Sequence, residues 1–236
     1  WPAMAMIVAV YLIAAVLNLG LKPMCRYVQL VPLSLHSVKF STFWESNRKL
    51  WRDPLGGVSL YVTTLYWGVG AVMQFAVLVW AQQTLALTLK SGAYLQALVA
   101  IGVIAGAFVA GRQFKLHSAR QALPWGLLLA VLLPVIVLVT NLWLAIALLL
   151  CIGVSGGMLL VPMNALLQHR GMQVLSAGRS IAVQGFNENL CVLLMLAAYS
   201  ALLAFGVPLA FIMLLLATLL VAGIAPLCLL LWRQYR

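Results

Sequence analysis

The chain has 236 residues, of which 65% are hydrophobic and only 7% charged, and its formal net charge is +11. Soluble domains carry about 25% charged residues, so this composition excludes a water-soluble fold and predicts an all-α membrane protein. Because the basic residues lie between apolar segments, the positive charge indicates membrane topology, and we expect no nucleic-acid partner.

Seven segments are apolar enough, and at about 20 residues long enough, to cross a bilayer as helices. They are residues 1–21, 58–82, 93–112, 122–140, 142–163, 178–205 and 208–232. The first segment starts at Trp1 within an apolar run, so we expect the sequence to lack its amino-terminal part. Continuous apolar runs of this kind exclude the alternating pattern of a membrane β-barrel.

The longest polar connection, 22–57, separates the first predicted helix from the other six. Within it, residues 38–52 have helical spacing: aromatic side chains fall near one face and basic ones elsewhere. These aromatic residues are Phe40, Phe43, Trp44 and Trp51. The pattern predicts an amphipathic helix that lies on membrane lipids of the inner leaflet. An ordinary polar loop is the alternative.

The distribution of basic residues predicts the orientation. If the first helix ends in the cytoplasm, Lys90 is the one residue of the 14 Lys and Arg that falls outside. Cytoplasmic loops of membrane proteins are enriched in Lys and Arg. We therefore expect the 22–57 connection and the carboxyl terminus to lie in the cytoplasm of a multi-pass protein.

Catalytic signatures are missing from the sequence. It contains no phosphate-binding loop, no GxSxG, no HExxH and no CxxC motif. The only acidic residues, Glu45, Asp53 and Glu188, are too far apart in the chain for a local pair of carboxylates. We therefore expect no catalytic residues, no cofactor and no metal site, and the sequence favours a transporter over an enzyme.

Glu188 is the acidic residue that falls inside a predicted membrane helix, nine positions after Arg179. This places it about 14 Å along the helix, near the middle of the bilayer. Intramembrane acids are costly and usually functional, so we expect Glu188, with Gln184 and Asn187 beside it, to bind substrate or relay protons. The alternative is that these groups only bond neighbouring helices.

Gln74 is the strongly polar side chain deep in the predicted helix 58–82. It either bonds the Glu188 helix or lines a cavity for substrate. In helix 142–163, Pro162 and Asn164 have the pattern of a helix end.

Residues 153–171, followed by 176–184 and Glu188-Asn189, resemble the bacterial lysophospholipid transporter (LplT) family of the major facilitator superfamily. Residues 65–70 and 99–102 are also similar to that family. The resemblance covers nearly everything after residue 55.

The resemblance implies that 58–236 is the six-helix carboxyl-terminal half of a major facilitator transporter. Residues 1–21 would be the helix that precedes the interdomain linker 22–57, and an amino-terminal half would be the partner. Such proteins transfer lysophosphatidylethanolamine and related lysolipids to the inner leaflet of the bacterial inner membrane by alternating access. An acyltransferase then reacylates them.

The resemblance also bears on the site residues. Glu188 matches an acidic position of the family's pathway, whereas at Gln74 we expect many relatives to carry Arg, which suits a lipid phosphate. Two other functions stay open: a proton-coupled major facilitator transporter of a drug or sugar, and a non-transporting membrane scaffold that docks an acyltransferase through 22–57.

Overall fold

The computed structural model describes residues 2–19 and 40–234 and divides the chain into two units, Trp1–Lys39 and Phe40–Arg236. In the first unit, the described residues form α1 (Pro2–Leu19), an apolar helix of 18 residues. Most of the predicted 22–57 connection, including residues 38 and 39 of its expected amphipathic helix, lies outside the described residues.

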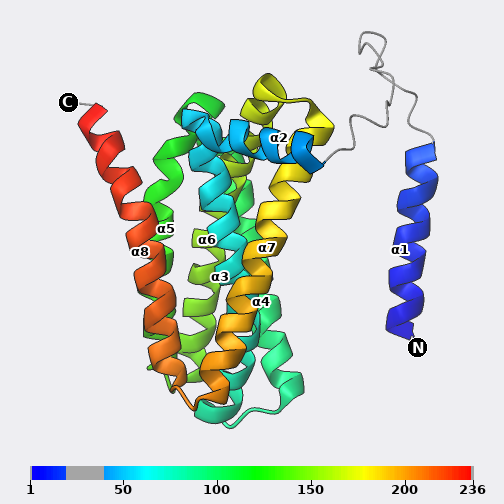
Figure 1. The fold of residues 1–236 in the computed structure, drawn as a ribbon. Helices are drawn as coiled ribbons and strands as arrows, with labels where there is room; N and C mark the ends of the chain where they lie inside the picture. The colour runs from blue at the N-terminus through cyan, green and yellow to red at the C-terminus, as the bar shows by residue number, and fades with distance from the viewer. Residues whose placement is uncertain (1, 20–39, 235–236) are drawn as a thin grey trace. The chain divides into compact units, whose positions relative to one another are not determined.

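The second unit is a bundle of long helices with a short helix across one end (Figure 1). The short helix is α2 (Phe40–Arg52). The bundle contains α3 (Pro54–Thr84), α4 (Leu89–Gln113), the 3-10 helix η2 (Leu116–Ala122), α5 (Leu123–Val137), α6 (Leu142–Val174), α7 (Ala177–Ala204) and α8 (Leu209–Gln234). Among the described residues, six helices are long and apolar enough to span a membrane. The predicted all-α, multi-pass membrane fold is confirmed.

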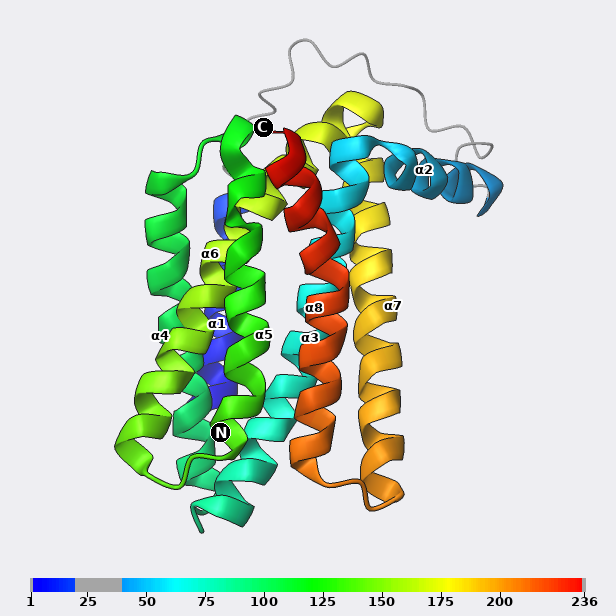
Figure 2. The ribbon, with the colours of Figure 1, turned by 90° about the vertical axis from the view of Figure 1, so that its left-hand side faces the viewer.

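Helix α6 lies against α3, α4 and α5, while α3 also packs on α7 and α5 on α8. Figure 2 shows α5 beside α8 and the far end of α2 reaching past α7. Large apolar side chains fill the space between these helices; Trp80, Leu133, Leu149 and Met163 are at most 1% exposed. Van der Waals contacts between packed side chains of this kind hold helices together in lipid.

Glycines allow α4 and α6 to approach until their backbones touch. A Cβ atom added at Gly102 or Gly106 would lie against the carbonyl oxygen of Leu150 or Val154, respectively, on α6. Additions at Gly153 and Gly157 on α6 would meet the carbonyl oxygens of Val99 and Val103 in the same way. The four-residue spacing of these glycines thus produces close helix packing.

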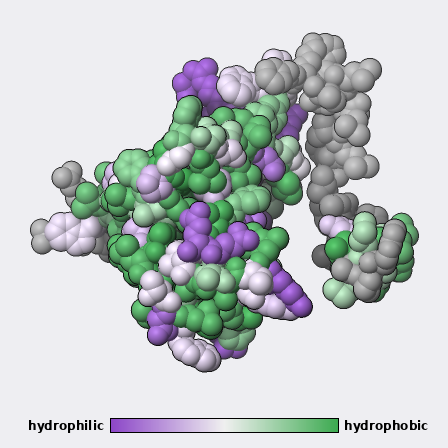
Figure 3. Space-filling view, turned by 90° about the horizontal axis from the view of Figure 1, so that it is seen from below, coloured by the Kyte–Doolittle hydropathy of each residue, from purple (hydrophilic) through white to green (hydrophobic). Residues whose placement is uncertain are grey.

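The basic side chains of the bundle gather at the end that α2 crosses. From the helix bounds, this end holds Arg48, Lys49, Arg52, Arg112, Lys115, Arg120, Arg170 and Arg179, and Lys90 lies at the opposite end. Figure 3 views the molecule from that opposite end and shows mostly hydrophobic residues with separate hydrophilic groups. The separation of charge expected from the sequence is therefore present along the bundle axis.

Two predicted helix ends were wrong. Helix α6 continues through Pro162 and Asn164 to Val174, although a helix end was expected there. Proline is tolerated inside a membrane helix when neighbouring helices surround it, and Pro162 is buried. Helix α3 begins at Pro54 rather than residue 58, because the Asp53 carboxylate caps it by accepting a hydrogen bond of 2.7 Å from the Gly56 N–H.

Asp53 also joins the start of α3 to the end of α6. Its carboxylate accepts two hydrogen bonds from the Arg170 guanidinium, of 2.6 Å and 3.0 Å, and the Asp53 side chain is only 9% exposed. The paired guanidinium holds the pKa of Asp53 below its ordinary value. One carboxylate therefore fixes both the first turn of α3 and its contact with α6.

Candidate functional site

A polar cluster connects α6 and α7 inside the bundle. The side-chain amide of Gln184 donates one hydrogen bond of 2.9 Å to the Asn164 oxygen on α6. It donates another of 2.9 Å to the carboxylate of Glu188, one turn later on α7. All three side chains are half-buried. The structure thus brings together Gln184 and Glu188, as expected, and adds Asn164.

A third helix reaches the same carboxylate. Thr63, a buried residue of α3, interacts electrostatically with Glu188, and its hydroxyl donates a hydrogen bond of 3.2 Å to the Leu60 carbonyl. Glu188 is the eleventh residue after the start of α7, about 17 Å along the helix at 1.5 Å per residue. Because Glu188 is only half-buried, part of its side chain is exposed, and the cost of a charge in hydrocarbon predicts that this part faces protein or water rather than lipid.

Asn187 is turned away from this cluster and toward α2. Its amide donates to the Asn47 oxygen at 2.8 Å and to the Val183 carbonyl at 2.7 Å. Its own oxygen accepts a hydrogen bond of 3.1 Å from the Trp51 indole. The structure therefore separates Asn187 from Gln184 and Glu188, which were expected to share a face with it.

The α2 residues that hold Asn187 also change the expected orientation of the amphipathic helix. Phe43 packs edge-to-face on Phe186 of α7, with ring centroids 5.1 Å apart, and Trp51 is bonded to Asn187, so neither joins Trp44 in one lipid-facing aromatic surface. Leu50 is fully buried on the same inner side. The expected aromatic face is thus divided, because part of it packs on the bundle.

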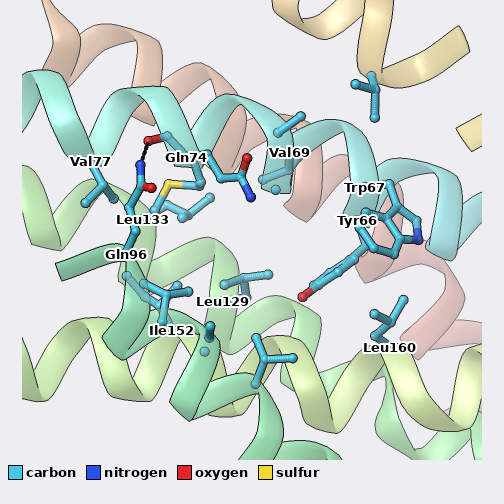
Figure 4. A pocket seen from close by; sticks show the side chains of 18 of the residues that line it. Tyr66, Trp67, Val69, Gln74, Val77, Gln96, Leu129, Leu133, Ile152 and Leu160 are labelled. Atoms are coloured by element: carbon cyan, nitrogen blue, oxygen red, sulfur yellow. Dashed lines mark hydrogen bonds between the residues drawn. The ribbon is translucent and has the colours of Figure 1, made fainter. Parts of the chain in front are cut away.

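A cavity of about 610 Å³ lies among α3, α4, α5 and α6, with one residue of α7 at its edge (Figure 4). Its wall is mainly aliphatic, formed by residues such as Val69, Val99, Val103, Leu133 and Ile152. The polar groups on the wall belong to Tyr66, Trp67, Gln74 and Gln96, and Figure 4 shows the Tyr66 hydroxyl directed into the space. A large apolar cavity with few polar groups suits the hydrocarbon part of a ligand.

Gln74 lines this cavity and lies apart from the Glu188 cluster. Its backbone carbonyl accepts a hydrogen bond from the side chain of Gln96 on α4 (Figure 4). The Gln74 side chain is exposed and lines the cavity. Gln74 was expected either to bond the Glu188 helix or to line a cavity, and the structure places it on a cavity wall.

The cavity and the polar cluster are neighbours along two helices. Val192, at the cavity edge, is one turn after Glu188 on α7, and Trp67 is one turn after Thr63 on α3. Between them α3 and α7 touch closely, because a Cβ added at Gly68 would lie 2.6 Å from the Cys191 sulfur. The cavity and the polar cluster are therefore separate sites, one helical turn apart along α3 and α7.

Sequence reasoning missed Asn164, Thr63 and Gln96. The signal for Gln96 was available, since it is an amide side chain inside the predicted helix 93–112. Among the described residues, no group of three or more His, Cys, Asp or Glu side chains is placed to hold a metal ion.

The chain is similar to curated proteins named lysophospholipid transporter LplT. It is 40% identical to the protein of Pectobacterium carotovorum over 168 residues, which are 71% of this chain and 41% of the relative. For the Escherichia coli protein the identity is 39% over 168 residues, covering 71% and 42%. For that of Serratia proteamaculans it is 37% over 205 residues, covering 84% and 50%.

The aligned part thus spans about half the length of these relatives or somewhat less. No family model matches the chain, and no solved structure does. The matches agree with the resemblance seen in the sequence, and the relatives are transporters rather than enzymes.

Proposed function

We propose that this chain, a homologue of the lysophospholipid transporters, supplies one half of a transporter that moves lysophospholipids across the bilayer. The observation that carries the proposal is the apolar cavity that begins one helical turn from the Glu188 cluster. A lysophospholipid has one polar head and one acyl chain, so it needs these two environments side by side.

In this proposal the head group binds at Glu188 and Gln184, with Asn164 as a further polar contact, and the acyl chain enters the cavity. Gln184 uses its amide N–H groups on Asn164 and Glu188, which fixes the carboxylate and leaves the Gln184 oxygen as an acceptor. Gln74 contributes a neutral amide on the cavity wall. Asn187 supports the site from the α2 side.

The other wall of the pathway comes from an amino-terminal half. Transporters of this class bind substrate between two six-helix halves, which rock against one another to expose the site to each side in turn. Residues 58–236 form the carboxyl-terminal half in this scheme, 22–57 the interdomain linker, and 1–21 the helix before it. The six long helices and the short α2 at their end are consistent with this division.

We place the chain in the bacterial inner membrane with α2 and the carboxyl terminus in the cytoplasm. The support is the gathering of basic side chains at the α2 end of the bundle, because Lys and Arg are enriched in cytoplasmic loops. Transport then runs from the outer to the inner leaflet. Lysophosphatidylethanolamine and similar lysolipids delivered there would be reacylated by an acyltransferase partner.

A transport assay in reconstituted vesicles tests this function. The chain alone should insert but should not flip labelled lysophosphatidylethanolamine, since its polar cluster lacks an opposing wall. Co-expression with the amino-terminal half of a lysophospholipid transporter should restore flipping. Flipping by the chain alone would contradict the two-half arrangement and favour two copies around one pathway. A restored transporter that carries a drug or sugar but no lysolipid would refute the proposed cargo.

A further inference from the structure

Helix α2 has an inner side that packs on the bundle and an outer side that does not. Ser46, Asn47 and Leu50 on the inner side are 5%, 8% and 0% exposed. The outer side carries the exposed basic residues Arg48 and Arg52. A helix of this kind has one face for the protein and another for the surface that lies outside it.

The inner side is attached to the turn of α7 that carries Glu188. Asn47 and Trp51 occupy the donor and acceptor groups of the Asn187 side chain. Asn187 is the residue immediately before Glu188, and Phe43 holds Phe186 just before that. A displacement of α2 would remove three contacts from consecutive residues of α7, so the position of α2 and the geometry of this turn are linked.

The outer side has an excess of positive charge. Glu45 pairs with Lys49 at 2.7 Å, and this ion pair lowers the pKa of the Glu45 carboxyl, so the helix has no second acid to neutralise Arg48 and Arg52. Trp44 is 54% exposed on the same helix. Exposed arginines beside a tryptophan are typical of a helix at the boundary between anionic headgroups and acyl chains.

The position of α2 in the fold suits the same surface. It crosses the end of the bundle at which the basic side chains gather, and in Figure 2 it extends past α7 toward the outside of the bundle. A helix in this place meets the headgroup layer of the leaflet that surrounds that end. Charge complementarity therefore points to anionic phospholipids as the occupant of the outer side.

We propose that α2 is a lipid-dependent latch: anionic headgroups bound at Arg48 and Arg52 keep α2 seated, and seated α2 holds Asn187 and thereby the Glu188 turn. The proposal rests on the cytoplasmic placement of α2 given above and adds regulation to the same site. Asn47 and Trp51 are positioning residues in this scheme, since they act on the site through Asn187. The anionic lipid content of the inner leaflet then controls how well the Glu188 cluster is formed.

Distances between spin labels in nanodiscs test the latch without any transport measurement. In a chain whose four cysteines are replaced, Ser41→Cys reports on α2 and Gly185→Cys on the α7 turn, each paired with Gly111→Cys on α4. Ser41 is exposed, and a Cβ added at Gly111 or Gly185 meets nothing within 4 Å. In phosphatidylcholine containing phosphatidylglycerol, both pairs should give one narrow distance, and in phosphatidylcholine alone both should broaden.

Three double variants, one of them a control, separate the steps. Arg48→Gln with Arg52→Gln should lower the ratio of seated α2 to α2 released from the bundle by about 30-fold. This factor follows from the usual attraction of two basic residues to an anionic surface. The control, Arg112→Gln with Lys115→Gln, removes two charges at the same end and should change nothing. Asn47→Ala with Trp51→Phe should abolish the lipid response of the Gly185 pair.

The outcomes that overturn the latch are distinct from failure of the transport proposal. Equal distance distributions in neutral and anionic lipid would show that headgroups do not hold α2. An equal effect of the control variant would show that any loss of positive charge at this end releases α2, and that Arg48 and Arg52 have no specific role. A Gly185 pair that still follows lipid composition in the Asn47→Ala, Trp51→Phe chain would disprove the link through Asn187. None of these results depends on which cargo the protein carries.

Discussion

The Gln184 amide donates to Glu188 and to Asn164 with the same nitrogen, at 2.9 Å in each case, so it holds the carboxylate of α7 at a fixed place beside α6. The charge of Glu188 can therefore be tested by itself. Glutamine has nearly the shape of glutamate, so Glu188→Gln removes the charge and changes the packing around it little.

Glu188→Gln should reduce lysolipid transport by about tenfold or more in the assembled transporter, since a hydrogen bond to a charged group contributes about 1.5–3 kcal/mol. The amount of protein in the membrane should not fall, because the substitution removes an intramembrane charge. Flipping rates and protein levels measured together check this. Asn189→Ala, an exposed neighbour on the same helix, is the control and should transport normally. Normal transport by Glu188→Gln would reduce the acid to a structural role.

The orientation is open to labelling with a membrane-impermeant thiol reagent. In a cysteine-free chain in intact cells, Gln83→Cys and Thr140→Cys should react, because both positions are exposed at the bundle end that lacks α2. Ser41→Cys and His117→Cys, exposed at the other end, should react only after the membrane is permeabilised. The reverse pattern would mean that the basic end faces outward.

The contact between α4 and α6 predicts a difference between two glycines of α4. Gly106→Leu should lower the free energy of unfolding by about 1–3 kcal/mol, because the new side chain has to displace the Val154 backbone. Gly111→Leu, where a Cβ meets nothing within 4 Å, should leave the unfolding temperature in detergent almost unchanged. Similar loss of stability in both variants would show that the close contact with α6 does not decide the effect, since leucine favours a helix more than glycine does.

The Asp53–Arg170 ion pair predicts a pH dependence of stability. Because Arg170 lowers the folded-state pKa of Asp53 below 3.8, the pair stabilises the fold above that pH and its contribution is lost as the pH falls through the lowered pKa. Thermal unfolding followed from neutral pH to about pH 3 should show this loss in the original chain. Asp53→Asn keeps a capping oxygen and should be less stable at neutral pH, with a weaker pH dependence.

Asp53→Ala removes the cap as well as the charge and should cost about 1 kcal/mol more than Asp53→Asn. Equal stability of the two variants would mean that the cap contributes nothing to the start of α3. A pH dependence unchanged in Asp53→Asn would assign the acid sensitivity to another carboxyl.

The bundle was predictable because its helices are continuous apolar segments, and apolar length is the signal that lipid imposes. The ends of α3 and α6 were not, since both helices continue beyond the apolar segment into turns held by polar contacts such as that of Asp53 with Arg170. Apolar length carries no information on such contacts.

Within the candidate site, helical spacing was sufficient to pair Gln184 with Glu188, which lie one turn apart. Spacing along α7 did not reveal that Asn187 faces α2, because the direction of that side chain depends on where a separate helix lies. The contribution of Asn164 was hidden for the same reason: it arises from the packing of α6 on α7, which a single sequence does not specify.

The glycine contact between α4 and α6 has a mechanical consequence. Each backbone sits in the groove of the other, so neither helix can slide or turn without lifting off its partner. Helices α4 and α6 therefore form one rigid pair within the bundle. Movement within the bundle is therefore left to the helices around this pair, above all to α7. Side-chain contacts with α2, α3 and α6 hold α7 in place, whereas α4 and α6 are joined by close backbone contacts.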